Sequence, residues 1–452
     1  MLHLCLFYCI MFEIGVMSMN NINVDVNYKK NKRYKTAKYP IRQPIYLTGL
    51  IWILSKVTLL GKKYKVEKIN MEGLEPPYMM LSNHMAFVDF KLAAMGTGRH
   101  KVNNVVNIDG YYQRPWLMEW IGAICTRKFT MDLHLIKSIR KVLSRGDVLC
   151  MYPEARYSPA GTTSYIPESV GMLIKKNRVP VVAVVHRGNY LHCPFWDFRR
   201  KRKVPMHTTL TKILTPEEID NMSVDEINLK IREALSYNEY EYQQQNGILI
   251  KEDYRAEGLH KILYQCPHCL TESKMSSEGA EIFCTECGKR WTLNENGTLT
   301  ANEGETEFAQ IPDWFKWERE QVAAQIERGE YSFADDVDVF SMPGCWKFES
   351  LGEARLIHDP ENGFVIEGRY NGADYRIQRY PLQMNSLHIE YDWYRVRRDD
   401  CIDISTEDDS FYCYFKNAKN VVTKLGFATE ILYLNDLKKK RPDSIDVVKP
   451  QI

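Results

Sequence analysis

The sequence lacks any long, uncharged apolar run. Its longest apolar stretches are Leu2 to Met19, which carries Glu13, and Ile45 to Leu60, which is interrupted by Ser55 and Lys56. Both are shorter than the roughly 20 residues that cross a bilayer core. The first also lacks the basic leader of a signal peptide. We therefore expect no membrane-spanning helix.

A charge bias is missing as well, and so are internal repeats, low-complexity tracts and a G-x-S-x-G element. The 60 Lys and Arg residues nearly balance the 58 Asp and Glu residues, so the net charge is +2. Nucleic acid is therefore not an expected partner, and no serine nucleophile of the G-x-S-x-G kind is expected. A chain of 452 residues is too long for one core, which predicts several domains.

Short apolar runs alternate with helical patterns over residues 45–245. This alternation predicts an α/β domain whose mixed, mostly parallel sheet is covered by helices. The predicted buried strands are Tyr78 to Leu81, Val148 to Tyr152 and Val179 to Val185, with a helix at Val170 to Lys176. Two helix starts match the capping box, in which a Ser or Thr and a Glu exchange hydrogen bonds with the backbone: Thr215 with Glu218, and Ser223 with Glu226.

The pattern changes after residue 245. Residues 246–295 hold a linker and a small cysteine module, and residues 296–335 hold a helical linker with a helix from Asp313 to Arg328. Residues 336–452 predict a C-terminal antiparallel β domain with a final helix, Asn417 to Leu432. Its strongest signal is Asn371-Gly372, a two-residue turn between alternating segments.

Four of the 12 cysteines form two close pairs, Cys266-Pro-His-Cys269 and Cys284-Thr-Glu-Cys287. Two C-x2-C pairs predict a zinc ribbon, in which four thiolates hold Zn²⁺ and the metal replaces a core that a small module cannot build. We interpret this zinc as structural, because four protein ligands leave no open position. The other eight cysteines are single and predict reduced thiols in a cytoplasmic compartment.

Basic residues precede the Ile45 to Leu60 stretch. The tail, residues 1–44, ends in a polar, basic segment from Asn27 to Arg42, and Trp52 lies within the apolar stretch. This combination is typical of a protein that lies on an anionic membrane surface, where each basic residue contributes about 1 kcal/mol. We predict an interfacial helix at 45–60 and a peripheral position on the cytoplasmic face of the cell membrane. A solvated tail before a core helix is the alternative.

A His and an Asp lie five positions apart directly after the first predicted strand, in Leu81-Ser-Asn-His-Met-Ala-Phe-Val-Asp89. Side chains five apart on one helix point about 140° away from each other. The pair can therefore meet only if His84 lies on a loop and Asp89 opens the next helix. There Asp89 would accept the Nδ1 hydrogen and make His84 a general base for a hydroxyl. A purely structural pair is the alternative.

Four ordered motifs resemble the glycerophospholipid acyltransferase family of the lysophosphatidate acyltransferase type. Asn83-His84 and Asp89 match its N-H-x4-D motif. The other three motifs resemble Gly122-Ala-Ile-Cys-Thr-Arg-Lys128, Tyr152-Pro-Glu-Ala-Arg-Tyr-Ser158 and Val179-Pro-Val-Val-Ala-Val-Val185. The sequence departs from the family where its Gly, Thr and Arg are replaced by Ala155, Arg156 and Tyr157. The family's other Arg falls on Lys128, beside Arg127.

The resemblance implies an O-acyltransferase of phospholipid biosynthesis. Its donor would be acyl-CoA or acyl-acyl carrier protein, and its acceptor 1-acylglycerol 3-phosphate or a related lysophospholipid. We expect His84 and Asp89 to be catalytic, backbone amides near the helix start to stabilise the oxyanion, and four residues to bind substrate: Arg127, Lys128, Glu154 and Arg156. The alternatives are another acceptor, such as glycerol 3-phosphate or an aminolipid, and a non-catalytic zinc-ribbon scaffold that binds partners or nucleic acid.

One further basic run, Arg199-Arg-Lys-Arg-Lys203, follows Phe195 and Trp196. Beside an acyltransferase domain it suggests a second contact with anionic lipid, or with the acidic surface of an acyl carrier protein. A solvated loop explains it equally well.

Overall fold

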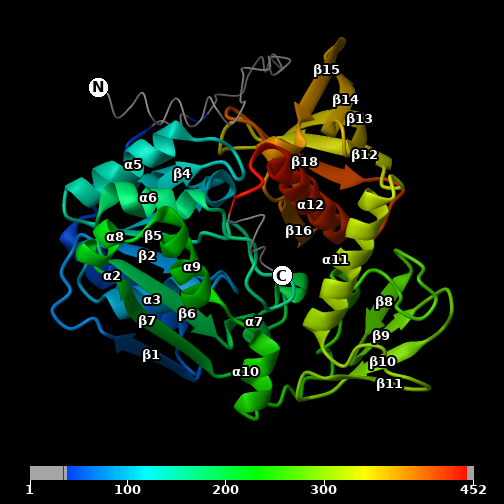
Figure 1. Ribbon diagram of the computed structural model, residues 1–452, viewed down its shortest axis with the longest axis horizontal. Coiled ribbons are helices and arrows are strands. Elements are labelled where there is room, and N and C mark those ends of the chain that lie inside the picture. Colours follow the sequence, from blue (N-terminus) through cyan, green and yellow to red (C-terminus); the bar gives the residue numbers. More distant parts are fainter. Residues whose placement is uncertain (1–33, 35–37, 445–452) are drawn as a thin grey trace.

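The computed structural model describes residue 34 and residues 38–444. These residues form three sheets, which Figure 1 shows as separate regions joined by helices. The predictions for Leu2 to Met19 and for most of the basic segment after Asn27 lie outside the described residues. Two basic residues of that segment are described: Lys38 pairs with Glu119, and Arg42 with Asp147.

The first sheet has seven strands in the order β1-β7-β6-β2-β5-β3-β4. Neighbouring strands are parallel except for β6 and β7, so the predicted mixed, mostly parallel sheet is confirmed. Its strands are β1 (Tyr64–Ile69), β2 (Met79–Ser82), β3 (Val102–Asn107), β4 (Ile124–Thr126), β5 (Val148–Met151), β6 (Val181–Arg187) and β7 (Met206–Leu214).

Helices cover both faces of this sheet, because the central strands carry apolar side chains on both faces. Met79 and Leu81 of β2 pack into one apolar cluster and Met80 into another, because successive strand side chains point to opposite faces. The helices are α2 (Ile45–Thr58), α3 (Asp89–Thr97), α4 (Pro115–Trp120), α5 (Leu133–Ser144), α6 (Ser169–Asn177), α7 (Asn189–His192), α8 (Pro216–Asn221), α9 (Val224–Leu235) and α10 (Glu239–Gln245), with 3-10 turns η1 (Ile108–Tyr111) and η2 (Phe195–Asp197). Both predicted capping boxes are present, at the starts of α8 and α9.

The second sheet is small and antiparallel, and it carries the four paired cysteines. It follows the 3-10 turn η3 (Leu259–Lys261) and consists of β8 (Met275–Glu278), β9 (Glu281–Cys284), β10 (Arg290–Leu293) and β11 (Leu299–Ala301). Helix α11 (Ile311–Glu327) then runs from this sheet to the C-terminal region (Figure 1), close to the predicted Asp313 to Arg328.

The third sheet is antiparallel, with seven strands in the order β15-β14-β13-β12-β18-β17-β16. Its elements are β12 (Phe333–Ser341), β13 (Glu349–Asp359), β14 (Gly363–Tyr370), β15 (Ala373–Arg379), the 3-10 turn η4 (Pro381–Gln383), β16 (His388–Trp393), β17 (Asp399–Ser405), β18 (Ser410–Phe415) and helix α12 (Val422–Lys440). Asn371 and Gly372 form the predicted hairpin turn between β14 and β15, both with positive φ. The predicted α/β, ribbon and antiparallel β architecture is therefore confirmed.

The final helix begins later than its apolar pattern predicts, at Val422 rather than Asn417. The backbone N–H groups of Asn417 and Ala418 donate to the Asp335 carboxylate, and Asn420 has a φ of 53°. These residues are bound to β12 and cannot enter the helix. At its other end the helix continues past Leu432 to Lys440.

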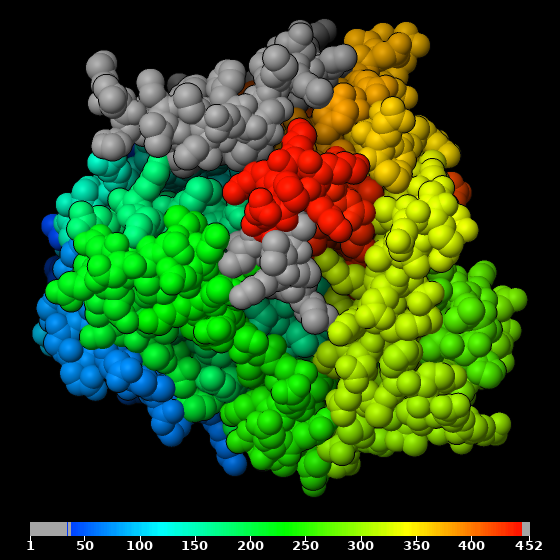
Figure 2. All heavy atoms as spheres, in the orientation of Figure 1, coloured from blue at the N-terminus to red at the C-terminus, as the bar shows by residue number. Residues whose placement is uncertain are grey.

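Strand β18 of the C-terminal sheet is buried between two layers. Every residue of β18 is buried. On one side Trp393, Tyr412 and Tyr414 pack in one cluster with residues of η1 and β4. On the other side lies α12, which fills the space between the α/β region and the C-terminal strands (Figure 2). One apolar cluster contains side chains from both sides of residues 245, 295 and 335. The domain boundaries predicted at these positions therefore stay predictions.

Candidate active site at the junction of the α/β region and the C-terminal sheet

The His84–Asp89 pair lies at the carboxyl end of β2, as its spacing predicts. His84 Nδ1 is 3.1 Å from Asp89 Oδ2, and Asp89 is the first residue of α3. The same oxygen accepts hydrogen bonds from the amides of Met85 (2.7 Å) and Ala86 (3.0 Å), and Oδ1 accepts one from Asn189 (2.7 Å). Asp89 is fully buried, yet both of its oxygens are bonded. The predicted oxyanion role cannot fall to these two amides, because Asp89 uses them.

The surroundings of His84 keep its imidazole neutral. Burial lowers its pKa most; Asp89 opposes this effect, and the charge of Lys128 adds to it. The ring stacks on Tyr152 at 4.1 Å and lies 4.0 Å from Tyr157. His84 Nε2 has no protein partner among the residues described, and the side chain keeps 19% exposure. With Nδ1–H donated to Asp89, Nε2 carries the free lone pair.

Asp89 stays ionised although it is buried. Burial alone would raise its pKa, but His186, His84 and Asn189 together hold it below its usual range. The adjacent Asn83 fixes the loop: its side chain accepts from the amide of His186 (2.8 Å) and donates to the carbonyl of the same residue (3.1 Å). Strands β2 and β6 are thereby joined where the site begins.

Glu154 holds the backbone around His84. Its two carboxylate oxygens accept hydrogen bonds from the amides of His84 (3.3 Å) and Ser164 (2.7 Å). Burial raises the pKa of Glu154 to about 7. The next residue, Ala155, has a φ of 54°, which costs an L-residue about 1–2 kcal/mol. A glycine would adopt this conformation without that cost.

The two arginines predicted to bind substrate contact the C-terminal region. Arg127 is buried and donates to the carbonyls of Met342 and Pro343 (both 3.2 Å) and to Ser410 Oγ (2.8 Å). Arg156 forms an ion pair with Glu430 of α12 at 2.6 Å. Both guanidinium groups thus join the α/β region to the C-terminal sheet and helix. Their substrate-binding role stays a prediction.

Lys128 differs from both arginines. Its ammonium has no ion pair or hydrogen bond with any residue that the structure describes. Burial lowers its pKa, while the carboxylates of Asp109, Glu390 and Asp403 oppose this effect. Of the three predicted basic residues, it is the one whose charged group remains available near His84.

The four paired cysteines lie together at one end of the small sheet. Cys266 Sγ is 3.8 Å from Cys287 Sγ, and Cys269 Sγ is 3.7 Å from Cys284 Sγ. All four sulfurs lie within 4.8 Å of one another, and none is in a disulfide. Tetrahedral Zn–S bonds of about 2.3 Å would place sulfurs about 3.8 Å apart. The group can therefore hold a metal ion such as zinc.

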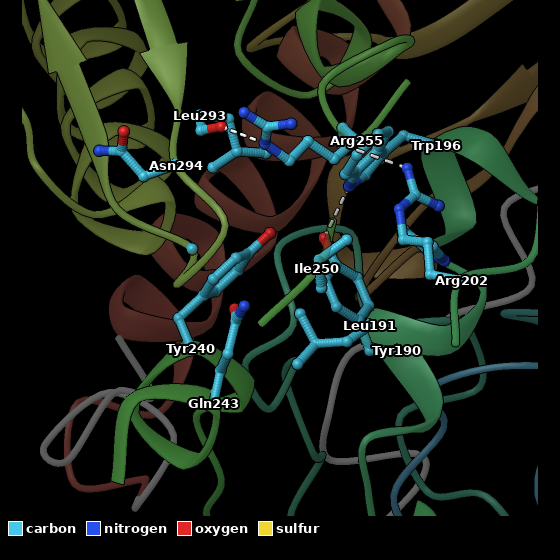
Figure 3. Close-up of a pocket in the computed structure, with 12 residues that line it drawn as sticks. Tyr190, Leu191, Trp196, Arg202, Tyr240, Gln243, Ile250, Arg255, Leu293 and Asn294 are labelled. Atoms are coloured by element: carbon cyan, nitrogen blue, oxygen red, sulfur yellow. Dashed lines mark hydrogen bonds between the residues drawn. The ribbon is translucent and has the colours of Figure 1, made fainter. Parts of the chain in front are cut away.

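A small cavity of about 20 Å³ lies between the α/β region and the small sheet. Figure 3 shows Trp196 donating to the hydroxyl of Tyr190 on one side and Arg255 donating to the carbonyl of Leu293 on the other. Gln243 Oε1, which is buried, has no hydrogen-bond partner. A space of this size holds about one water molecule and no substrate. The cavity is part of the packing between the two regions.

The basic run at Arg199 to Lys203 is partly used within the protein. Arg202 is buried, pairs with Asp197 and lies over the Trp196 ring at 5.1 Å. Arg200 pairs with Asp197 and Glu257. Arg199 lies 3.9 Å from the Asp392 carboxylate. Three of the five basic residues therefore have partners within the protein, and contact of the run with lipid or carrier stays a prediction.

Several residues at the site carried no recognisable sequence signal. His186 lies near the carboxyl end of β6 and Asn189 follows this strand. The carboxyl ends of parallel strands are where α/β sheets place ligands, so the fold pointed to this edge. Asp109, His388 and Glu390 are brought together by packing between distant segments. No local motif connects them to His84.

No protein-family model matches the chain, and no curated protein matches it. Among solved structures, the chain is similar to the crystal structure of the 1-acyl-sn-glycerophosphate (LPA) acyltransferase PlsC from Thermotoga maritima. The TM-score is 0.33 at 16% sequence identity, over 42% of this chain and 78% of that one. A likeness of this strength does not assign the chain to that enzyme's family.

Proposed function

We propose that the protein is an O-acyltransferase. It moves a fatty acyl group from the thioester of CoA or of acyl carrier protein to the free hydroxyl of 1-acylglycerol 3-phosphate or a related lysophospholipid. One observation carries the proposal: His84 donates Nδ1–H to a buried, fully bonded carboxylate, while its Nε2 has no partner among the residues that the structure describes. That arrangement is the resting state of a general base. The four sequence motifs around it favour acyl transfer.

In the proposed reaction, His84 Nε2 takes the proton of the acceptor hydroxyl as its oxygen attacks the thioester carbonyl carbon. Asp89 stabilises the imidazolium that forms. The tetrahedral intermediate then expels the thiolate, which takes the proton from His84 and leaves as a thiol. Lys128, whose charge reaches His84, balances the negative charge of the bound substrates.

We also propose that α2 holds the protein on an anionic membrane surface. Among the described helices, none is long and apolar enough to cross a bilayer. However, α2 exposes Ile45, Tyr46, Leu50, Ile53, Leu54 and Val57. It packs on α3. Phe87, just before α3, and Phe90, in its first turn, are also exposed. The Lys91 ammonium lies 5.8 Å from the centre of each of these two rings. An exposed apolar face edged by lysines fits the interface of anionic lipid. A lipid acceptor would then reach the site from the bilayer, at the cytoplasmic face.

We also propose that the protein holds zinc as a structural cofactor. The four-cysteine group would hold Zn²⁺ with all of its positions filled, so the ion would fold the ribbon and take no part in acyl transfer.

The test is acyl transfer by the purified chain on vesicles that contain anionic lipid. A labelled acyl thioester is offered with 1-acylglycerol 3-phosphate, glycerol 3-phosphate or an aminolipid. We expect His84→Ala to abolish transfer to every acceptor while leaving the fold and vesicle binding intact. His134→Ala is the control, because this partly exposed residue lies on α5 and bonds to Ser138. Full activity of His84→Ala would refute the mechanism.

A further inference from the structure

The side chain of Tyr157 is held against the ring of His84. The two ring centres are 4.0 Å apart, and the Tyr157 ring also lies 5.2 Å from Phe195, a residue of the apolar core. Two backbone hydrogen bonds fix the loop around it. The amide of His84 donates to the Glu154 carboxylate (3.3 Å), and the amide of Ser158 donates to the carbonyl of His84 (2.8 Å). Both its ring and its backbone therefore keep Tyr157 in place beside His84.

The hydroxyl of Tyr157 has no hydrogen-bond partner in the described part of the chain. A second phenol, Tyr152, also contacts the His84 ring, and its hydroxyl is enclosed and has no partner. The Tyr157 hydroxyl is not enclosed in this way, and its side chain is half-buried. Of the two phenols on His84, Tyr157 is thus the one whose hydroxyl a ligand can reach.

The phenol of Tyr157 keeps its proton near neutral pH. Burial raises its pKa well above the usual value, and the charges of Asp89, Glu390 and Asp109 add to this effect. A neutral phenol can donate its O–H to an acceptor. A fixed hydrogen-bond donor without a protein partner therefore lies beside the proposed base.

The proposed reaction needs a donor of this kind. When an alcohol attacks a thioester, the carbonyl oxygen becomes an oxyanion, which enzymes stabilise with preorganised donors that include tyrosine hydroxyls. The amides of Met85 and Ala86, which follow His84 in the chain, already donate to Asp89. The stabilising donor therefore has to come from another group near His84.

We propose that the Tyr157 hydroxyl donates a hydrogen bond to the oxyanion of the tetrahedral intermediate, which makes Tyr157 a further catalytic residue. This inference rests on the proposed acyltransferase function and adds a residue to its site. The acceptor hydroxyl gives its proton to His84 as its oxygen bonds to the carbonyl carbon, and an electron pair of the C=O bond moves to the oxygen that Tyr157 binds. This pair returns as the C–S bond breaks and the thiolate takes the proton from His84. Tyr157 keeps its own proton throughout.

The first test compares Tyr157→Phe with Tyr152→Phe in the full-length chain, because each removes one hydroxyl and keeps the ring on His84. We expect Tyr157→Phe to lower kcat about 100-fold or more and to leave KM within about threefold, since the loss of one oxyanion donor has an effect of this size. Tyr152→Phe should lose at least about tenfold less, because it removes a buried hydroxyl that has no partner. Urea titrations check that both variants are folded. Neither removes a hydrogen bond within the protein.

Three results of this comparison would overturn the inference. The first is a kcat of Tyr157→Phe that matches the wild type. The second is a rise in KM alone, which would make the hydroxyl a substrate-binding group. The third is an equal loss of kcat in both variants, which would mean that the two phenols only support His84. Absence of transfer by the wild-type protein to every acceptor would instead refute the proposed function.

The pH dependence of kcat/KM gives a second readout, since its acid limb reports the protonation of His84. Tyr157→Phe should lower kcat/KM at every pH without moving this limb. The ring that covers His84 is kept, and the charged neighbours Asp89, Lys128 and His186 are unchanged. A limb that moves together with the loss of rate would mean that the hydroxyl acts through His84, and this result would overturn the oxyanion role.

Discussion

The His84–Asp89 pair and the basic residues near it differ in where their partners come from. His84 is bonded to Asp89, five residues along the chain, and Asp89 to amides three and four residues before it. Arg127 is bonded to Met342 and Ser410, more than 200 residues away, and Arg156 to Glu430. The His84–Asp89 contact is local, although Asn189, 100 residues along the chain, binds the other Asp89 oxygen. The partners of the two arginines all depend on the tertiary fold.

This difference has a functional consequence. The loop after β2 and the start of α3 bring His84 and Asp89 together. The end of one strand is therefore enough to position the proposed base. Arg127 and Arg156 instead join two regions. Of the three basic residues, Lys128 alone has no ion pair or hydrogen bond with the described part of the chain. We infer that the C-terminal sheet completes the site and is not an independent appendage.

The largest effect is expected at the four cysteines, whose partners also come from nearby in the chain. Cys284→Ser should remove zinc and unfold the ribbon, because structural zinc contributes roughly 10 kcal/mol or more to such modules. Trp291 and Trp314, whose rings lie 5.0 Å apart in the ribbon core, would report this as a red shift of fluorescence. Cys193→Ser, a single cysteine, should keep the zinc. A ribbon that stays folded without metal would contradict the prediction.

The next largest effect concerns the catalytic pair. Asp89→Asn should lower kcat about 1,000-fold or more, because an amide no longer fixes the His84 tautomer or stabilises the imidazolium. Steady-state rates would measure this. Asp220→Asn, which removes the exposed partner of Arg178, should match the wild type. A loss below tenfold would show that His84 does not act as the base.

The difference between partners nearby in the chain and partners from distant segments also explains what the sequence could predict. Strands β2, β5 and β6, both capping boxes, the Asn371-Gly372 turn and the cysteine geometry follow from neighbours in the chain, and all are confirmed. The partners of Arg127 and Arg156 come from packing between regions, which local patterns do not encode. The late start of α12 has the same cause, because Asp335 of β12 captures its first residues.

The third prediction separates the structural and substrate-binding roles of Arg156. Its ion pair with Glu430 is nearly buried, but Glu430 also pairs with Arg319. The loss of Arg156 therefore leaves the carboxylate one cationic partner and costs about 2 kcal/mol. Arg156→Met should therefore lower the free energy of unfolding by about that amount in urea titrations. Adding Glu430→Met should recover part of it. If Arg156 instead binds phosphate alone, stability would change by less than about 0.5 kcal/mol and only KM would rise.

The smallest effect is expected for Lys128, whose charge lowers the pKa of His84. Activity should fall at acidic pH as His84 gains a proton, and its lowered pKa places this limb below about pH 6.5. Lys128 disfavours that proton, whereas Asp89 favours it and His186 lies close by. Lys128→Met should therefore raise the pKa of His84 and move the acid limb of kcat/KM upward by about half a pH unit. Lys137→Met, on α5, should not move it. A limb that stays in place in Lys128→Met would mean that the ammonium lies too far from His84 to serve the same substrate, and that the basic residues and the catalytic pair act separately.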